Sequence, residues 1–285
     1  MSGAQGELPF KGEILGISNI LADTAQSIDD LYRAATEPGK DPPWSALFNR
    51  IAKSTHMAPF NLMLADLQRP GARYVAFREN WAKVGRIVKP GVIPIIILWP
   101  FCPIRCAYDL ADTEGPAEDD ALLARVFGEP LEMKDNAAAS LGNKAKKHDA
   151  IETRFVDLGS NLAGDARTTG AEFAKKGETQ KPRWLVRIGN HLHDSARFVT
   201  LTHELGHIYL GHLGGNSNKW PDRRPPRLDV REFEAEAVSF IVGSRFGLQT
   251  SSAEYLRGYI KGDTINHVSF SAIARAAGRI EQHAR

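Results

Sequence analysis

The sequence has few cysteines, no apolar run long enough to cross a membrane and little net charge. Only Cys102 and Cys106 occur among 285 residues, which is too few for a disulfide framework or for a structural zinc site without other ligands. The apolar run over residues 92–99 is too short to cross a bilayer, and the first residues lack the basic-then-apolar order of a signal peptide. We therefore expect a cytoplasmic protein that has no membrane partner.

The formal net charge of +2 gives no evidence for a nucleic-acid partner along the whole chain. Residues 44–105 differ, because nine Lys or Arg residues stand there against Asp66 and Glu79, a local excess of seven positive charges. Aromatic residues lie between these cations, and single-stranded DNA is bound by cations that follow phosphates and rings that stack on bases. The alternative is an ordinary solvated surface. The candidate DNA-binding residues are Arg73, Arg78, Trp81, Lys83, Arg86 and Lys89.

An HExxH motif, residues 202–207 with the preceding threonine, is the strongest chemical signal in the chain. On a helix, His203 and His207 lie one above the other and can bind one metal ion, while Glu204 lies where it can take a proton from water. The surrounding helix, over about 195–211, is apolar nearly all round, which predicts burial. The alternative is a pair of core histidines bonded to backbone carbonyls. Gly206 would let another backbone or a substrate approach closely.

A catalytic zinc needs a third protein ligand. The metzincin extension is excluded because Leu210 and Leu213 stand where it requires Gly and His, and His212 is interpreted as a helix-end residue. Residues 231–241 form a second amphipathic segment, in which Glu232 and Glu236 share one flank of the apolar stripe. We predict Glu232 as the third ligand and Glu236 as the acid that orients a metal-bound histidine, with the two roles exchangeable.

Glu234 falls on the other flank of that stripe, which predicts that it faces away from the histidines. The alternative for all three acids of the segment is a solvated helix face.

The pattern along the chain predicts an α+β protein of two domains. Residues 1–120 read as a small α+β domain, with helices over 17–36 and 44–68, the second interrupted near Pro59, strands over 74–77 and 92–98, and a helical turn over 78–85. Residues 121–150, rich in Ala and Lys, read as a linker or exposed connector.

Residues 151–285 form the second predicted domain. A strand over 184–188 precedes the HExxH helix and could pair with substrate through its edge. Asp229 is a candidate N-cap for the second site helix, and the Pro-rich stretch 220–227 is a lid or a stiff connection.

These residues resemble a known group of proteins. Residues 198–212 and 231–240 look like the zincin-like metallopeptidases of the ImmA/IrrE group and the related C-terminal domain of ArdC-type antirestriction proteins. The N-terminal half is similar to the ArdC-type N-terminal domain in residues 59–64, 81–86, 89–91, 95–100 and 108–115. The resemblance implies a zincin-like domain with an HExxH helix, a short sheet and a Glu-bearing second helix. It also implies single-stranded DNA binding by the N-terminal domain.

The predicted function is that of a zinc-dependent metalloendopeptidase, with Mn²⁺ as the alternative metal. Glu204 would serve as general base, and Tyr255, Tyr259 and His267 are the candidates for a donor to the oxyanion. The expected partners are a protein substrate, a transcriptional repressor among the candidates, and single-stranded DNA. The alternative function is a DNA-binding antirestriction or mobile-element protein whose peptidase fold is mainly a scaffold.

Overall fold

The computed structural model describes residues 28–30, 43–99, 102–116, 121, 127, 129–174, 179–216, 219–224, 227–248 and 256–285. Its helices and strands confirm an α+β protein. Most of the predicted helix over 17–36 lies outside the described residues, although 28–30 are helical. The longer helices are α2 (Pro43–Lys53), α3 (Pro59–Gln68), α6 (Ala137–Asp149), α7 (Asp194–Tyr209), α8 (Leu228–Arg245) and α11 (Phe270–Ala284). Within the described ranges no helix has both the length and the apolarity that a bilayer crossing requires.

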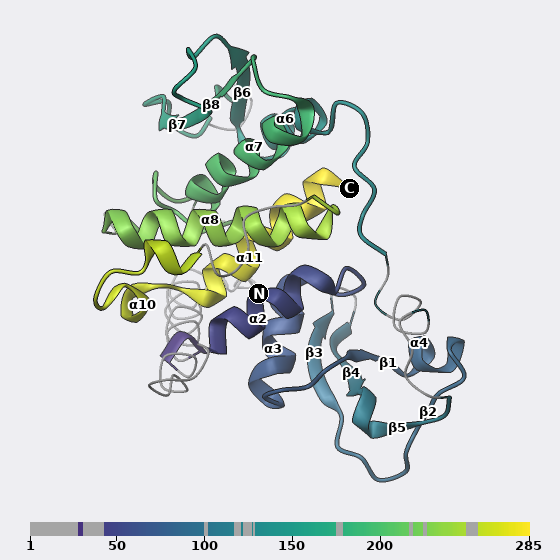
Figure 1. Cartoon of the computed structure of the whole chain (residues 1–285). Helices are drawn as coiled ribbons and strands as arrows, with labels where there is room; N and C mark the ends of the chain where they lie inside the picture. The colour runs from purple at the N-terminus through teal and green to yellow at the C-terminus, as the bar shows by residue number, and fades with distance from the viewer. Residues whose placement is uncertain are drawn as a thin grey trace, which may run out of the picture.

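The longer helices lie together between two three-stranded sheets (Figure 1). Helix α8 is central, because it packs against α7, α11 and α2. Its predicted apolar stripe, Phe233, Ala237, Phe240 and Ile241, is buried, as the amphipathic spacing requires. The expectation that Asp229 caps α8 is wrong: Arg227, two residues earlier, holds the N-cap position and Asp229 lies in the first turn.

The sheet next to α7 contains β6 (Ile151–Val156), β7 (Gly164–Thr168) and β8 (Trp184–Gly189) in the order β6-β8-β7. The strand predicted over 184–188 is therefore present. The expectation that its edge could pair with substrate is wrong, because β8 is hydrogen-bonded to β6 on one side and to β7 on the other. Strand β7 is one of the two edge strands of this sheet, and it is the edge strand that packs on the site helix α7.

The second sheet has the order β1-β4-β3, with β1 (Val75–Phe77), β3 (Ile95–Trp99) and β4 (Cys102–Asp109). Two side-chain amides of α3 close the outer edge of β3: Gln68 exchanges hydrogen bonds with the backbone of Ile96, and Asn61 does the same with Leu98. These amides take the place of a neighbouring strand. The remaining short elements are α4 (Arg78–Lys83), β2 (Ile87–Val88), η1 (Leu110–Asp112), β5 (Thr113–Glu114), η2 (Arg257–Tyr259) and α10 (Thr264–His267).

The larger of two apolar clusters extends across residue 120, and the smaller one lies within residues 76–127. One apolar cluster contains residues from Trp44 to Ile280, including α2, α3 and the C-terminal helices. The expectation that the connector over 121–150 is exposed is wrong in its second half, because Ala138, Leu141 and Ala145 of α6 are fully buried. Small Ala side chains let α6 pack closely against α7 and α11. The helices of the predicted first domain are thus part of the scaffold that holds α7 and α8.

Candidate metal centre

Helix α7 places the two histidines of the HExxH motif side by side. The Nε2 atoms of His203 and His207 lie 3.2 Å apart, as expected for positions i and i+4 on one helical face. Gly206 allows α8 to approach, since a Cβ atom there would lie only 3.4 Å from Cα of Ala235. The expectation that another backbone comes close at Gly206 is confirmed.

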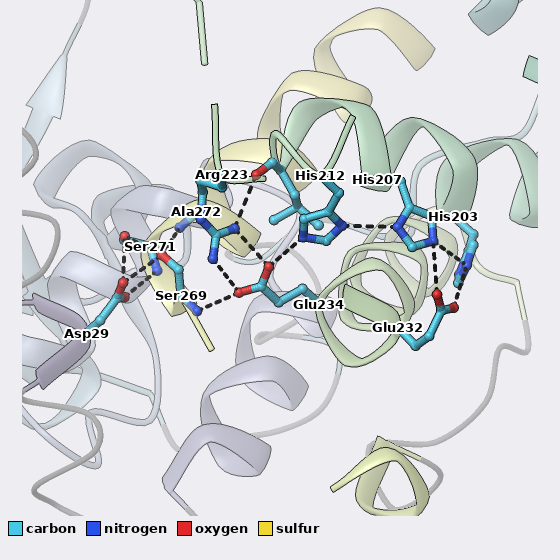
Figure 2. A network of polar contacts seen from close by, with 11 residues as sticks. Asp29, His203, His207, His212, Arg223, Glu232, Glu234, Ser269, Ser271 and Ala272 are labelled. Carbon is cyan, nitrogen blue, oxygen red and sulfur yellow. Dashed lines mark hydrogen bonds and ion pairs between the residues drawn. The ribbon is translucent and has the colours of Figure 1, made fainter. Parts of the chain in front are cut away.

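Helix α8 brings a carboxylate to the same place. Glu232 Oε2 lies 3.7 Å from His203 Nε2, and Glu232 Oε1 lies 3.8 Å from His207 Nε2. The three potential ligand atoms are within 4.8 Å of one another, and Figure 2 shows the three side chains converging. Glu236 contacts the opposite nitrogen of the first ring, with Oε2 3.1 Å from His203 Nδ1. The structure therefore brings together His203, His207, Glu232 and Glu236. Glu232 faces both Nε2 atoms, as expected of a ligand, and Glu236 contacts Nδ1 of His203, as expected of the acid that orients the ring.

The spacing of these atoms fits a tetrahedral metal. With metal–ligand bonds of about 2.0–2.1 Å, neighbouring ligand atoms of a tetrahedron lie about 3.3 Å apart. The two histidine nitrogens, 3.2 Å apart, are close to this value, and the Glu232 carboxylate faces both of them, with Oε2 3.7 Å from His203 Nε2 and Oε1 3.8 Å from His207 Nε2. Two imidazoles and one carboxylate also match the donor set of catalytic zinc sites. The residues present thus fit a zinc ion without rearrangement of the backbone.

The electrostatics of the group favour a cation. Burial lowers the pKa of His203, but hydrogen bonds with Glu232 and Glu236 and the charge of Glu204 outweigh burial and raise it to about 9. The hydrogen bond with His203 in turn lowers the pKa of Glu232. Burial and the charges of neighbouring histidines lower the pKa of His207 to about 3. His207 is therefore neutral at physiological pH, which is the form that binds a metal.

Glu204 is buried beside this group and has an altered pKa. Burial raises the pKa of Glu204 to about 7, the charge of His203 opposes this shift, and the charges of Asp165 and Glu232 add to it. A carboxyl group with a pKa near neutrality can both accept and return a proton at physiological pH. Asp165 is part of β7, so the edge strand lies within electrostatic reach of Glu204.

A further polar chain extends from His207 into the interior. The Nδ1 atoms of His207 and His212 are 3.0 Å apart, and His212 Nε2 lies 2.8 Å from Glu234 Oε2. Glu234 also forms a two-pronged ion pair with Arg223. Figure 2 shows this chain beginning at the candidate metal centre. The sequence interpretation left out both His212 and Glu234 as functional residues, and Glu234 is fully buried rather than solvated.

The candidate oxyanion donors are separated by the structure. Tyr259 and Glu232 line the same cavity of about 570 Å³. His267 lines a different cavity of about 520 Å³ and pairs with Asp263. Tyr255 lies outside the described residues. Of the two described candidates, Tyr259 is the one that shares a cavity with Glu232.

Two of the predicted DNA-binding residues are wrong, because they are not at the surface. Trp81 is fully buried, and its indole N–H donates to the carbonyl of Tyr108 at 3.0 Å. Arg86 is buried as well, and its guanidinium donates to Thr113 and to the carbonyl of Pro116. Neither side chain can contact a base or a phosphate in this fold. The remaining predicted DNA-binding residues, Arg73, Arg78, Lys83 and Lys89, are exposed.

The comparisons with known proteins give a distant structural likeness. No family model matches the chain, and no curated protein does. Among solved structures, the chain is similar to the Mn(II)-bound antirestriction protein ArdC from the R388 plasmid, with 15% identity and a TM-score of 0.44 over 91% of this chain and 97% of that one. The metal-free structure of the same protein gives 13% identity and a TM-score of 0.42, over 92% and 98% of the two chains.

Proposed function

We propose that this protein is a zinc-dependent metallopeptidase. The observation that carries the proposal is the convergence of His203, His207 and Glu232, whose potential ligand atoms all lie within 4.8 Å of one another. Glu204, the acid within the motif, has a pKa of about 7 at the same place. Two histidine ligands, a carboxylate as the third ligand and a nearby titratable acid form the arrangement that hydrolyses amides in zinc enzymes. Core histidines that bond only to backbone carbonyls would not need carboxylates from a second helix, whereas α8 brings both Glu232 and Glu236 to the histidines of α7.

The chain's own residues have distinct tasks in this proposal. His203, His207 and Glu232 would hold a divalent cation, which polarises a carbonyl and lowers the pKa of water when it is bound. Glu204 accepts a proton from the attacking water and returns it to the leaving amine, for which its pKa is suited. Glu236 accepts a hydrogen bond from Nδ1 of His203 and so holds that ring with Nε2 toward Glu232.

The substrate would lie along β7. This strand is an edge of its sheet, packs on α7 and contains Asp165, whose charge acts on Glu204. An extended peptide can add to such an edge through backbone hydrogen bonds. We therefore expect the peptide to bind to the edge strand β7 and not to the central strand β8.

The test is cleavage of an unfolded, carboxymethylated protein with and without a chelator. We expect chelator-sensitive cleavage by the zinc-loaded protein and its loss, by about a hundredfold or more, in Glu204→Gln. Glu132→Gln is the matched control, because Glu132 is exposed and the substitution should leave cleavage unchanged. Chelator-sensitive cleavage that is undiminished in Glu204→Gln would refute the role of Glu204.

Single-stranded DNA binding is a second proposal, supported by exposed cations on and near the β1-β4-β3 sheet. Arg78 lies over the ring of Tyr108 at 5.1 Å, and Lys83 and Lys89 are exposed. Burial of Trp81 removes one expected stacking ring, so phosphate contacts would dominate. The test is salt-dependent oligonucleotide binding by the full chain. Each lost phosphate contact should reduce the log–log salt slope by about 0.7, and Arg78→Gln with Lys83→Gln should show this while Lys146→Gln on α6 does not.

A further inference from the structure

We propose that His212 and Glu234 are positioning residues for His207: they fix the ring so that Nε2 points toward His203 and Glu232. The inference rests on the proposed metal centre and assigns a role to two residues outside it. Its basis is a continuous chain of hydrogen bonds from His207 through His212 to Glu234 (Figure 2).

The distances define which nitrogen carries each proton. His207 Nε2 faces His203 Nε2 at 3.2 Å and Glu232 Oε1 at 3.8 Å, so its lone pair serves as the ligand and the proton is on Nδ1. That proton can only be donated to Nδ1 of His212, at 3.0 Å. His212 must then carry its own proton on Nε2, where it donates to Glu234 Oε2 at 2.8 Å. Each ring thus has one tautomer that satisfies every contact.

Glu234 is held rigidly enough to set this direction. Its side chain is fully buried, and Arg223 donates to both oxygens, at 2.8 Å to Oε2 and 2.7 Å to Oε1. The backbone N–H of Ser269, at the start of α11, donates to Oε1 at 2.7 Å. With these bonds and the one from His212, the carboxylate has no freedom to rotate. It therefore acts as a fixed acceptor at the end of the chain.

The end of α7 explains why His212 reaches His207. Gly211 has φ of +80°, and the bonds from Gly211 N to Ile208 O and from His212 N to His207 O form a Schellman motif. In that motif the residue after the glycine folds back over the residue five positions earlier. Side-chain contact between those two positions is commonly apolar. Here it is a hydrogen bond between two imidazoles.

A purely structural role accounts poorly for this chain. An apolar residue at position 212 would complete the Schellman motif without burying a polar ring, and a buried ion pair is weak evidence for stability. His203 contacts the carboxylate of Glu236 directly, whereas His207 reaches the carboxylate of Glu234 through the ring of His212. Both histidines thus have an acceptor on the ring nitrogen that faces away from Glu232. Such acceptors orient metal-bound histidines, and their loss typically weakens metal binding about 10- to 100-fold.

The test measures zinc affinity by competition with a chromophoric chelator, using the full chain. His212→Phe keeps a ring of similar shape but removes the acceptor, and we expect its zinc dissociation constant to rise about 10- to 100-fold. His212→Asn keeps an acceptor oxygen near the former Nδ1 and should lose less. His191→Phe is the matched control, because His191 is exposed and the substitution should leave zinc affinity unchanged.

A second measurement does not depend on any variant. In the zinc-loaded protein, nitrogen-15 chemical shifts should show a proton on Nδ1 of His207 and on Nε2 of His212. A proton on Nδ1 of His212 would overturn the proposal, as would a folded His212→Phe whose zinc affinity is within twofold of the unaltered protein. If the unaltered protein binds no stoichiometric zinc, the metal centre and this role both fail. If it binds zinc but Glu204→Gln cleaves normally, only the proposed function fails.

Discussion

Asp149, the last residue of α6, is a buried charge whose removal should destabilise the fold. Its side chain is fully inaccessible to solvent. It accepts hydrogen bonds from Tyr209 at 2.9 Å, Lys219 at 2.7 Å, Arg279 at 2.6 Å and His283 at 2.8 Å. These partners belong to α7, the segment after it, and α11. The carboxylate therefore joins elements that are far apart in the sequence.

Asp149→Asn keeps the shape of the side chain but replaces one acceptor oxygen with an NH2 group, which would face the donors that now bond to the carboxylate. Breaking a buried ion pair by removing one partner costs about 3–5 kcal/mol. For a chain of this size that corresponds to a fall in Tm of about 5–8 °C. Chemical unfolding followed by circular dichroism would measure the free energy. Asp135→Asn is the matched control, because Asp135 is exposed and the change should stay within about 0.5 kcal/mol.

The pH dependence gives a second check on Asp149. Burial raises the pKa of its carboxyl, but the hydrogen bonds from His283, Arg279, Lys219 and Tyr209 outweigh burial and hold it far below the ordinary range. A lowered folded-state pKa stabilises the protein above the unfolded value of about 3.9 and loses this effect as pH falls. The gap between the unaltered protein and Asp149→Asn should therefore narrow by about 1.3 kcal/mol from pH 6 to pH 3. A gap below about 1 kcal/mol at pH 6, or one that widens in acid, would refute this reasoning.

Three further outcomes follow from other sites. Arg245→Met should lower the free energy of unfolding in urea by about 3–5 kcal/mol, because its buried guanidinium donates to four carbonyls of the α2–α3 segment and pairs with Glu281; an unchanged midpoint would contradict this. Gly211→Ala should lower both Tm and zinc affinity, since a Cβ there would lie 2.2 Å from the carbonyl oxygen of Pro221 at φ of +80°; calorimetry and chelator competition would measure the two effects. Glu204→Gln should stabilise the metal-free protein at pH 8 by about 2–4 kcal/mol, because burial raises the folded-state pKa to about 7 and the cost of ionising Glu204 grows as pH rises from about 4.5 to 7. Equal stability of the two proteins in a chelator at pH 8 would show that Glu204 is not buried as described.

Local periodicity predicted the parts of the site that lie within single helices. The i, i+4 spacing of His203 and His207 and the stripe beside Glu232 need only helical geometry, and both helices form where they were expected. The strand over 184–188 was also predictable from its apolar run. Its central place in the sheet was not, because β6 and β7 carry weak apolar signals.

Long-range packing accounts for what the sequence did not reveal. The burial of Trp81 depends on Phe127 and Tyr108, which are distant in the chain. Helix α6 was interpreted as an exposed connector because Ala-rich helices give little apolar contrast. The sequence predicts His212 as a helix-end residue, which is correct, but it assigns His212 no contact with the site. Recognising Gly211 as a helix stop would have placed His212 over His207.

The central claim is that His203, His207 and Glu232 together hold one zinc ion. Metal content measured by mass spectrometry, after loading with zinc and dialysis, tests this most directly in the unaltered protein beside His203→Ala and the exposed-site control His191→Ala. The account predicts about one zinc per chain in the unaltered protein and in His191→Ala, and no stoichiometric zinc in His203→Ala. An unaltered protein without stoichiometric zinc, or a His203→Ala variant that keeps it, would contradict the account.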